Sequence, residues 1–142
     1  MLDELDQRLV ALLRTDARMA VANLAITLKI SRATAKSRID RLVSSGVISG
    51  FTAVLSENDN HGVRAITMVQ VDGKHEEAVM KRLMGLPEVR HLHGTNGKWD
   101  FVAELEAPNV GAFDELLRKI RQIDGIANTD TSILLKARKV VA

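Results

Sequence analysis

Positive side chains follow a serine in the first third of the chain and could bind nucleic-acid phosphates. Ser31 is of a residue type that caps a helix by accepting hydrogen bonds from the backbone N–H groups of its first turn. The helix that would follow carries four basic residues and only one acid, Asp40. Basic side chains on one helix can bind DNA phosphates, and the early residues of such a helix meet base edges in the major groove. We therefore predict DNA contacts from Arg18, Ser31, Arg32, Thr34, Ala35, Lys36, Arg38 and Arg41.

Some of these basic residues also have a purely structural interpretation. A run of charges can be a solvated helix face. Arg38 could instead pair with an acid of its own domain, such as Asp16, and Arg18 could form either a phosphate contact or a buried ion pair. The sequence leaves these alternatives open.

A glycine-rich turn at residues 94–97 is the second place where side chains could do chemistry. Asp100 follows the turn at the start of a predicted strand. A carboxylate can bind an ammonium group, and the backbone N–H groups of a glycine turn can bind a carboxylate. The segment therefore offers both kinds of group that a free amino acid requires. The alternatives are that Asp100 caps the turn and that Trp99 packs at an interface.

The sequence gives no support to enzyme or metal chemistry. His91 and His93 lie two residues apart on a predicted strand and share one face, but no third ligand is evident. The chain has no cysteine, which removes thiolate metal sites and thiol redox chemistry. It also lacks a nucleophile–base pair, a P-loop and a dinucleotide fingerprint. We expect a protein that is not an enzyme and that uses no metal or cofactor.

Three predicted helices position the basic residues. Asp3 can cap a helix that runs to about Arg14, in which leucines recur at helical spacing. A short second helix covers residues 21–28, and the third covers residues 32–45. A short helix, a tight turn and a basic helix form a helix-turn-helix, which reads the major groove of DNA. We place this DNA-binding domain at residues 1–48.

The rest of the chain alternates between strand and helix patterns. Residues 47–55 are β-branched and apolar enough for a strand, and we assign 49–62 to a strand and linker that ends in a polar run. Beyond it, strands are expected at 65–72, 89–93, 99–106 and 126–137, and helices at 76–86 and between Asn109 and Gly125. This β-α-β-β-α-β order favours a ferredoxin-like sheet with both helices on one face, so the fold class is α+β. Because no third layer remains, the open face should be apolar and should pack on a second copy of the chain.

Composition and charge fit a DNA-binding protein. The 142 residues are 46% hydrophobic but only 3% aromatic, so the cores must consist of aliphatic side chains. Residues 1–50 hold eight Lys and Arg against five Asp and Glu, whereas residues 51–142 hold twelve against thirteen, so the positive excess lies in the predicted helix-turn-helix. No apolar run approaches the ~20 residues that span a bilayer, and the acidic first residues lack a signal-peptide pattern. We expect a cytoplasmic protein without a membrane partner.

The order and spacing of these motifs resemble the Lrp/AsnC (feast/famine) family of bacterial and archaeal transcription regulators, over nearly the whole chain. The segments that carry the resemblance are Leu2-Asp3, Asp6, Asp16-Ala17-Arg18, Leu24-Ala25, Ser31, Arg38-Ile39, Arg41-Leu42, Gly46-Val47-Ile48, Gly97-Lys98-Trp99-Asp100 and Thr129-Asp130-Thr131-Ser132. The chain departs from the family at two places. Lys29 occupies the helix-turn-helix turn, where the family usually has glycine, and Lys98-Trp99 fills the variable part of the Gly-x-x-Asp segment.

The resemblance implies a sequence-specific regulator that binds double-stranded DNA and responds to an amino acid or a similar small metabolite. It implies that the C-terminal domain, residues 63–142, is of the RAM/AsnC type and serves effector binding and oligomerisation. The implied effector pocket lies between dimers, with Gly97, Trp99, Asp100 and Thr131 as its residues. The implied assembly is a homodimer that forms an octamer, a tetramer of dimers. The alternative is a small-molecule-binding oligomeric module whose helical domain mediates only protein contacts.

Overall fold

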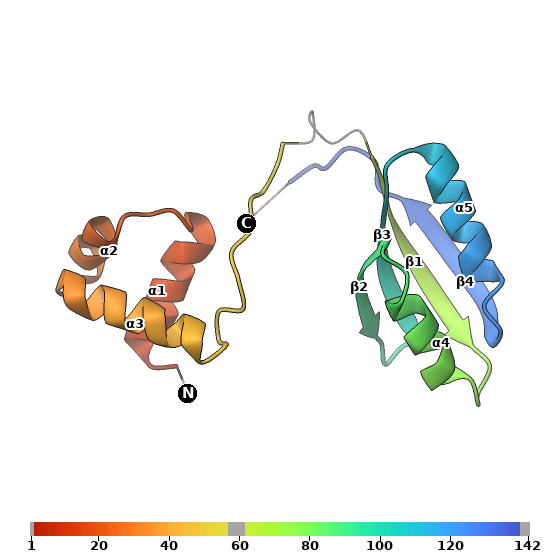
Figure 1. The fold of residues 1–142 in the computed structure, drawn as a ribbon, viewed down its shortest axis with the longest axis horizontal. Coiled ribbons are helices and arrows are strands. Elements are labelled where there is room, and N and C mark those ends of the chain that lie inside the picture. Colours follow the sequence, from red (N-terminus) through yellow and green to blue (C-terminus); the bar gives the residue numbers. More distant parts are fainter. Residues whose placement is uncertain (1, 57–61, 140–142) are drawn as a thin grey trace. The chain divides into compact units, whose positions relative to one another are not determined.

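A computed structural model describes residues 2–56 and 62–139 and divides them into two compact units (Figure 1). The first unit runs to Val54 and the second from Leu55 to Lys139. Each unit has a hydrophobic core of its own. The first is helical and the second combines a sheet with helices, which confirms the predicted α+β class.

The N-terminal unit contains the three predicted helices, α1 (Glu4–Thr15), α2 (Val21–Leu28) and α3 (Arg32–Ser44). Two predicted caps are present at their starts. The Asp3 carboxylate accepts a hydrogen bond from the N–H of Asp6 at 2.8 Å, and the Ser31 hydroxyl accepts one from the N–H of Thr34 at 3.0 Å. The core is built from leucines contributed by all three helices: Leu9, Leu13, Leu24, Leu28 and Leu42.

The turn between α2 and α3 is built on a left-handed lysine. Lys29 has φ 57° and ψ 46°, and it is the only non-glycine residue with positive φ in the described parts of the chain. Its N–H donates to the carbonyl of Ile26 at 3.2 Å, and the N–H of Ile30 donates to the carbonyl of Ala25 at 3.0 Å. This pair of bonds is the Schellman pattern that ends many helices. Lysine thus takes the conformation that glycine favours, at about 1 kcal/mol of backbone strain.

The strand predicted at residues 47–55 is wrong, because the structure contains no strand in this segment. Its composition is suitable, but a strand forms only when its backbone groups pair with a neighbouring strand. The described residues provide no such neighbour. Several large apolar side chains of the segment therefore stay exposed, among them Phe51 at 56% and Leu55 at 72%.

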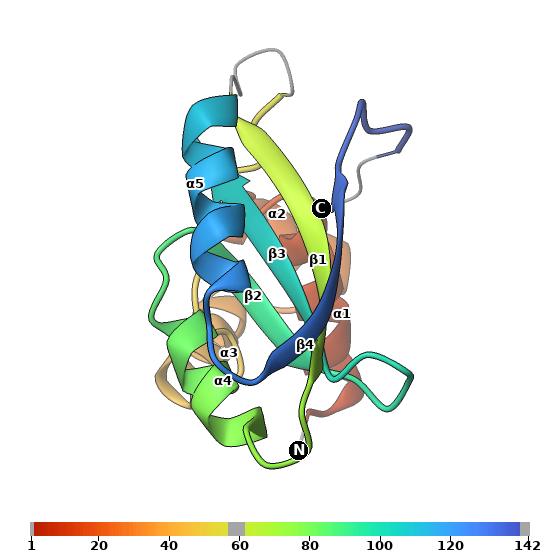
Figure 2. The same ribbon diagram turned by 90° about the vertical axis from the view of Figure 1, so that its right-hand side faces the viewer.

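The C-terminal unit is a four-stranded antiparallel sheet with two helices on one face (Figure 2). Its elements in chain order are β1 (Val63–Val71), α4 (Glu76–Met84), β2 (Val89–Gly94), β3 (Phe101–Ala107), α5 (Val110–Arg121) and β4 (Ile126–Ile133). The strands lie in the order β2-β3-β1-β4, so β2 and β4 are the edges. The predicted βαββαβ order and ferredoxin-like topology are confirmed. The last strand ends at Ile133 rather than residue 137, since its neighbour β1 begins only at Val63.

The helix-covered face of the sheet forms the core of this unit. Alternate residues of β3, namely Phe101, Ala103 and Leu105, are buried on this face. The helices and the other strands complete the core with Ala65, Val69, Val79, Leu83, Phe113, Leu116, Ile120 and Ile123.

The open face of the sheet is less apolar than predicted. Half-buried Ile66, Met68 and Val102 from the two central strands form its centre. Polar side-chain pairs flank this centre: His91 Nδ1 lies 2.9 Å from a Glu104 oxygen, and Arg90 Nε lies 3.9 Å from a Glu106 oxygen. Whatever packs on this face must therefore accommodate charges as well as apolar side chains.

Candidate DNA-binding surface and effector loop

The start of α3 is held by two hydroxyl groups. Ser31 Oγ accepts from the N–H of Thr34 and also donates to Thr34 Oγ1 at 2.8 Å. Both residues are exposed, so both hydroxyls lie where a DNA backbone or base edge can reach them. The capped N-terminus also directs free backbone N–H groups and the positive end of the helix dipole toward an approaching anion.

The outward side of α3 differs from the prediction at one residue. Ala35 has no exposed surface and packs into the helical unit, so the structure contradicts its assignment as a DNA contact. Arg32 and Lys36 are exposed, and neither forms an ion pair with any described residue. Ser37, for which no contact was predicted, is also exposed, and its position four residues before Arg41 places both on the same row of the helix.

Arg38 and Arg41 are engaged by acids of α1 and its cap. Arg38 Nη1 lies 3.1 Å from Asp6 Oδ1 and also contacts Asp3, while Arg41 Nη2 lies 3.0 Å from Asp6 Oδ2. Arg38 thus adopts the ion-paired alternative, but with Asp3 and Asp6 rather than with Asp16. The reason is that the start of α1 packs beside α3, whereas Asp16 accepts from the backbone N–H of Arg18 at 3.0 Å.

These contacts shift two ionisation equilibria. The hydrogen bond from Arg38 holds the pKa of the Asp3 carboxyl below its ordinary value. The same bond, together with the one to Asp6, raises the pKa of Arg38 further. Both groups are therefore charged throughout the neutral range.

Arg18 lies in the connection between α1 and α2. Its side chain is exposed and makes no ion pair with the described residues, so the buried-pair alternative is wrong for this arginine. Its guanidinium is available to a phosphate.

The loop at residues 95–100 is tied to the end of β1 by Asp100. One oxygen of Asp100, Oδ2, accepts from the N–H of Val71 at 2.7 Å, and its own N–H donates to the carbonyl of Val69 at 2.8 Å. Within the loop, the N–H of Gly97 donates to Thr95 Oγ1 at 3.3 Å. Asp100 therefore ties the loop to β1 rather than capping the turn, and this contact occupies only one of its oxygens.

Two further residues of the predicted effector site differ in their surroundings. Trp99 is half-buried, and the ammonium of Lys98 lies 5.7 Å from the centre of its ring. Thr131 lies on β4 and shares a 2.7 Å hydrogen bond with Thr67 on the helix-covered side of the sheet. Within one chain the structure does not bring Thr131 to the loop that holds Gly97, Trp99 and Asp100, because β1 lies between them.

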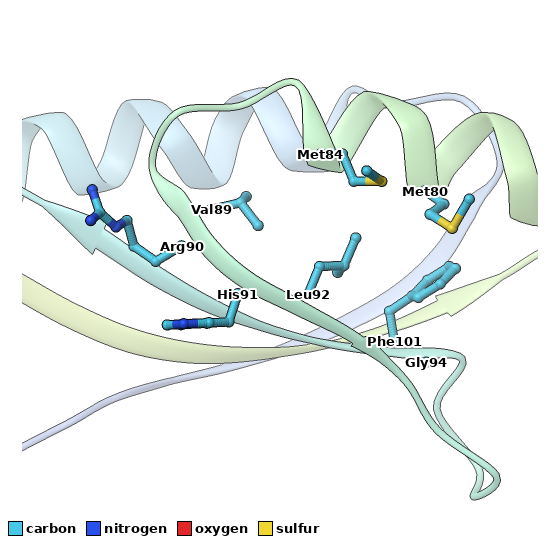
Figure 3. Close-up of a pocket in the computed structure, with 8 residues that line it drawn as sticks. All are labelled: Met80, Met84, Val89, Arg90, His91, Leu92, Gly94 and Phe101. Carbon is cyan, nitrogen blue, oxygen red and sulfur yellow. The ribbon is translucent and has the colours of Figure 1, made fainter. Parts of the chain in front are cut away.

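An apolar cavity of about 290 Å³ lies between α4 and the edge strand β2. Figure 3 shows Met80, Met84, Leu92 and Phe101 converging on it, while Arg90 points away. Its lining contains no carboxylate that could bind an ammonium group, so it fits an amino acid less well than the loop does.

Among the described residues, no three His, Cys, Asp or Glu side chains are grouped so that they could hold a metal ion. The described helices include none that is both long and apolar enough to cross a membrane.

A three-helix unit with a capped basic helix, followed by a ferredoxin-like domain, defines a helix-turn-helix regulator with a separate ligand-binding domain. Comparison with known proteins supports this class along the chain. Residues 2–43 match the AsnC-type helix-turn-helix domain, and residues 64–140 match the Lrp/AsnC ligand binding domain. The chain belongs to the Lrp/AsnC family of transcriptional regulators.

Individual relatives agree with this assignment. The HTH-type transcriptional regulator FL11 of Pyrococcus furiosus is 30% identical over 140 residues, which is 97% of this chain and 92% of that protein. The structure of AsnC from E. coli matches with a TM-score of 0.83 at 25% identity, covering 100% of this chain and 97% of the other. A Neisseria meningitidis transcriptional regulator, solved as a complex with L-Met, matches in fold with a TM-score of 0.84 at 22% identity, covering 99% and 94%. These relatives are transcriptional regulators, so the protein is a regulator and not an enzyme.

Proposed function

We propose that the protein is a sequence-specific regulator that binds double-stranded DNA through the outward side of α3. The observation that carries the proposal is that Arg32 and Lys36 are exposed on a capped helix without a protein counter-ion among the described residues. Exposed cations without a protein counter-ion can bind DNA phosphates, and hydroxyl groups early in the helix can form hydrogen bonds with base edges. The proposed contacts are Arg18, Ser31, Arg32, Thr34, Lys36, Ser37, Arg38 and Arg41.

The variants Arg32→Ala and Lys36→Ala test this proposal by fluorescence anisotropy on duplex DNA. Each should weaken binding while circular dichroism stays unchanged, because neither side chain supports the core. A lost phosphate contact should reduce the salt slope by about one, and a lost base contact should cost about 1–3 kcal/mol at one position of the operator. Arg8→Ala is the matched control, since it removes the same charge from an exposed position of α1. Unchanged binding in both α3 variants would refute the proposed surface.

We further propose that an amino acid or a similar small metabolite binds at a subunit junction formed by Gly97, Trp99, Asp100 and Thr131. The free Asp100 oxygen can accept an ammonium group, and the turn supplies backbone N–H groups for a carboxylate. The L-Met complex of the Neisseria meningitidis relative supports a ligand of this class. Since Thr131 lies apart from the loop within one chain, the complete site requires a second subunit.

A thermal-shift panel of the twenty amino acids tests effector binding, because a ligand that binds only the native state raises the melting temperature. Asp100→Asn is the informative variant. It keeps an oxygen that can accept from Val71 N–H but removes the charge that an ammonium group needs. The ligand that stabilises the parent should no longer stabilise this variant, and an equal shift in both proteins would place the site elsewhere.

We propose that the chain forms a homodimer through the open faces of its sheets and that four dimers form an octamer. Half-buried Ile66, Met68 and Val102 support an apolar contact at the centre of this face. In this account residues 1–48 read DNA, 49–62 link the domains, and 63–142 bind the effector and the other subunits. Since a regulator acts where the chromosome is, we place the protein in the cytoplasm. Light scattering that gave a native monomer would refute the assembly.

A further inference from the structure

The guanidinium of Arg38, on one flank of α3, is paired with the exposed acid Asp3. We propose that Asp3 occupies Arg38 as an internal competitor of phosphate and thereby limits the affinity of the protein for DNA. This inference rests on the DNA-binding function proposed above. Asp3 lies outside α3, at the cap of α1, and is brought to the arginine only by the fold.

Two carboxylates meet Arg38, and they differ in how firmly they are held. The Asp6 side chain is only 3% exposed and accepts from both Arg38 and Arg41, so it belongs to the interior of the helical unit. The Asp3 side chain is 52% exposed, and it contacts Arg38 but not Arg41. Asp6 is therefore a fixed part of the structure, whereas water can solvate Asp3 whenever it leaves the arginine.

A carboxylate and a phosphate use the same guanidinium N–H groups with similar geometry. While Asp3 is paired, its negative charge offsets the positive charge of Arg38 and repels a phosphate that approaches this flank of the helix. Exposed ion pairs of this kind are weak, so a phosphate held nearby by other cations of α3 can replace the carboxylate. Each binding event then includes the displacement of Asp3, which lowers the net gain.

The second role of Asp3 determines which substitution isolates this effect. Its carboxylate caps α1 by accepting from the N–H of Asp6 at 2.8 Å. Asparagine caps helices about as well as aspartate does. Asp3→Asn should therefore keep the cap and remove the negative charge, whereas alanine would remove both. Asp3→Ser, which also retains a capping oxygen, serves as a second variant with the same expected result.

The test measures the affinity of the full chain for a mixed-sequence DNA duplex at a series of salt concentrations. Asp3→Asn should bind roughly two- to fivefold more tightly at low salt, and the salt slope should steepen by up to about one for each DNA-reading unit. Glu4→Gln is the matched control. Glu4 is an exposed acid next to Asp3 that makes no ion pair with described residues, so the variant removes the same charge without breaking a contact. The gain should be clearly larger for Asp3→Asn than for Glu4→Gln.

A double-mutant cycle with Arg38→Gln assigns the effect to the contact. In the Arg38→Gln background, Asp3→Asn should give no more gain than Glu4→Gln. If Asp3→Asn and Asp3→Ser fold as the parent does, judged by circular dichroism, and bind no more tightly than Glu4→Gln, the inference is wrong. A gain that persists without Arg38 also overturns it. If the parent binds no duplex at all, the proposed DNA-binding function is refuted, and this inference falls with it.

Discussion

Replacement of the buried acid Asp6 should destabilise the N-terminal unit strongly. Asp6 is 2% exposed, and its two oxygens accept from Arg38 at 3.1 Å and from Arg41 at 3.0 and 3.3 Å. Asp6→Asn keeps the size of the side chain but removes the charge and one acceptor oxygen. The variant therefore isolates the ion-pair contribution from any loss of packing.

The expected magnitude follows from the exposure of the partners. Hydrogen bonds to charged groups contribute about 1.5–3 kcal/mol each, and breaking a buried pair costs about 3–5 kcal/mol. Arg41 is 60% exposed and regains water, and Arg38 keeps its contact with Asp3, so the net loss should be about 2–3 kcal/mol. A unit of this length has a stability of about 3–8 kcal/mol, so Asp6→Asn should remove a large part of it.

Urea unfolding with two probes measures this effect. Circular dichroism reports the helices of both units, whereas the fluorescence of Trp99, the single tryptophan, reports the C-terminal unit. Asp6→Asn should lower the midpoint seen by circular dichroism and leave the Trp99 transition in place. Asp40→Asn is the control, because Asp40 is an exposed acid of α3 without an ion pair in the described chain. A loss no greater than that of the control would refute the assignment of Asp6 as the acid that joins α1 to α3.

Three further predictions concern pH, assembly and a backbone turn. Because Arg38 holds the pKa of Asp3 below its ordinary value of 3.8, the stabilisation by Asp3 is complete above about pH 4 and is lost as the pH falls through the lowered pKa. The difference in urea midpoint between the parent and Asp3→Asn should therefore vanish in acid. A difference that stays constant with pH would contradict this. Met68→Glu, on the open sheet face, should dissociate the proposed dimer in light scattering, whereas Met84→Glu, on exposed α4, should not; equal effects would exclude the open face. Gly125→Ala should lower the free energy of unfolding that Trp99 reports by more than about 1 kcal/mol, because Gly125 has φ +98° and an added Cβ would lie 2.3 Å from His75 Cβ. Gly73→Ala, whose added Cβ meets no atom within 4 Å, should be nearly neutral.

The helices of the N-terminal unit were predictable because their signals are local. Asp3 and Ser31 mark helix starts through bonds to residues three positions away, and leucines at helical spacing mark the core. The same local reasoning failed for residues 47–55. Strand formation depends on a neighbouring chain segment, and no property of Val47 or Phe51 reveals whether that neighbour exists.

The candidate site was predictable only in part, because side-chain partners depend on the tertiary fold. The sequence identified the basic residues of α3 but could not show that Arg38 meets Asp3, 35 residues away, rather than Asp16. The burial of Ala35 and the outward position of Ser37 follow from the helical period once the core side is known. Ala35 lies four and seven residues before Ile39 and Leu42, so the helical period places it on their core side.

The salt dependence of DNA binding by the parent protein tests the central claim most directly. If α3 binds phosphates through Arg32 and Lys36 in each of two subunits, the logarithm of the binding constant should fall linearly with the logarithm of salt concentration. Neutralisation of at least four phosphates predicts a slope of about −3.6 or steeper on duplex DNA. The absence of binding to any duplex at low salt, or binding whose strength does not change with salt, would contradict the claim that this protein acts by binding DNA through α3.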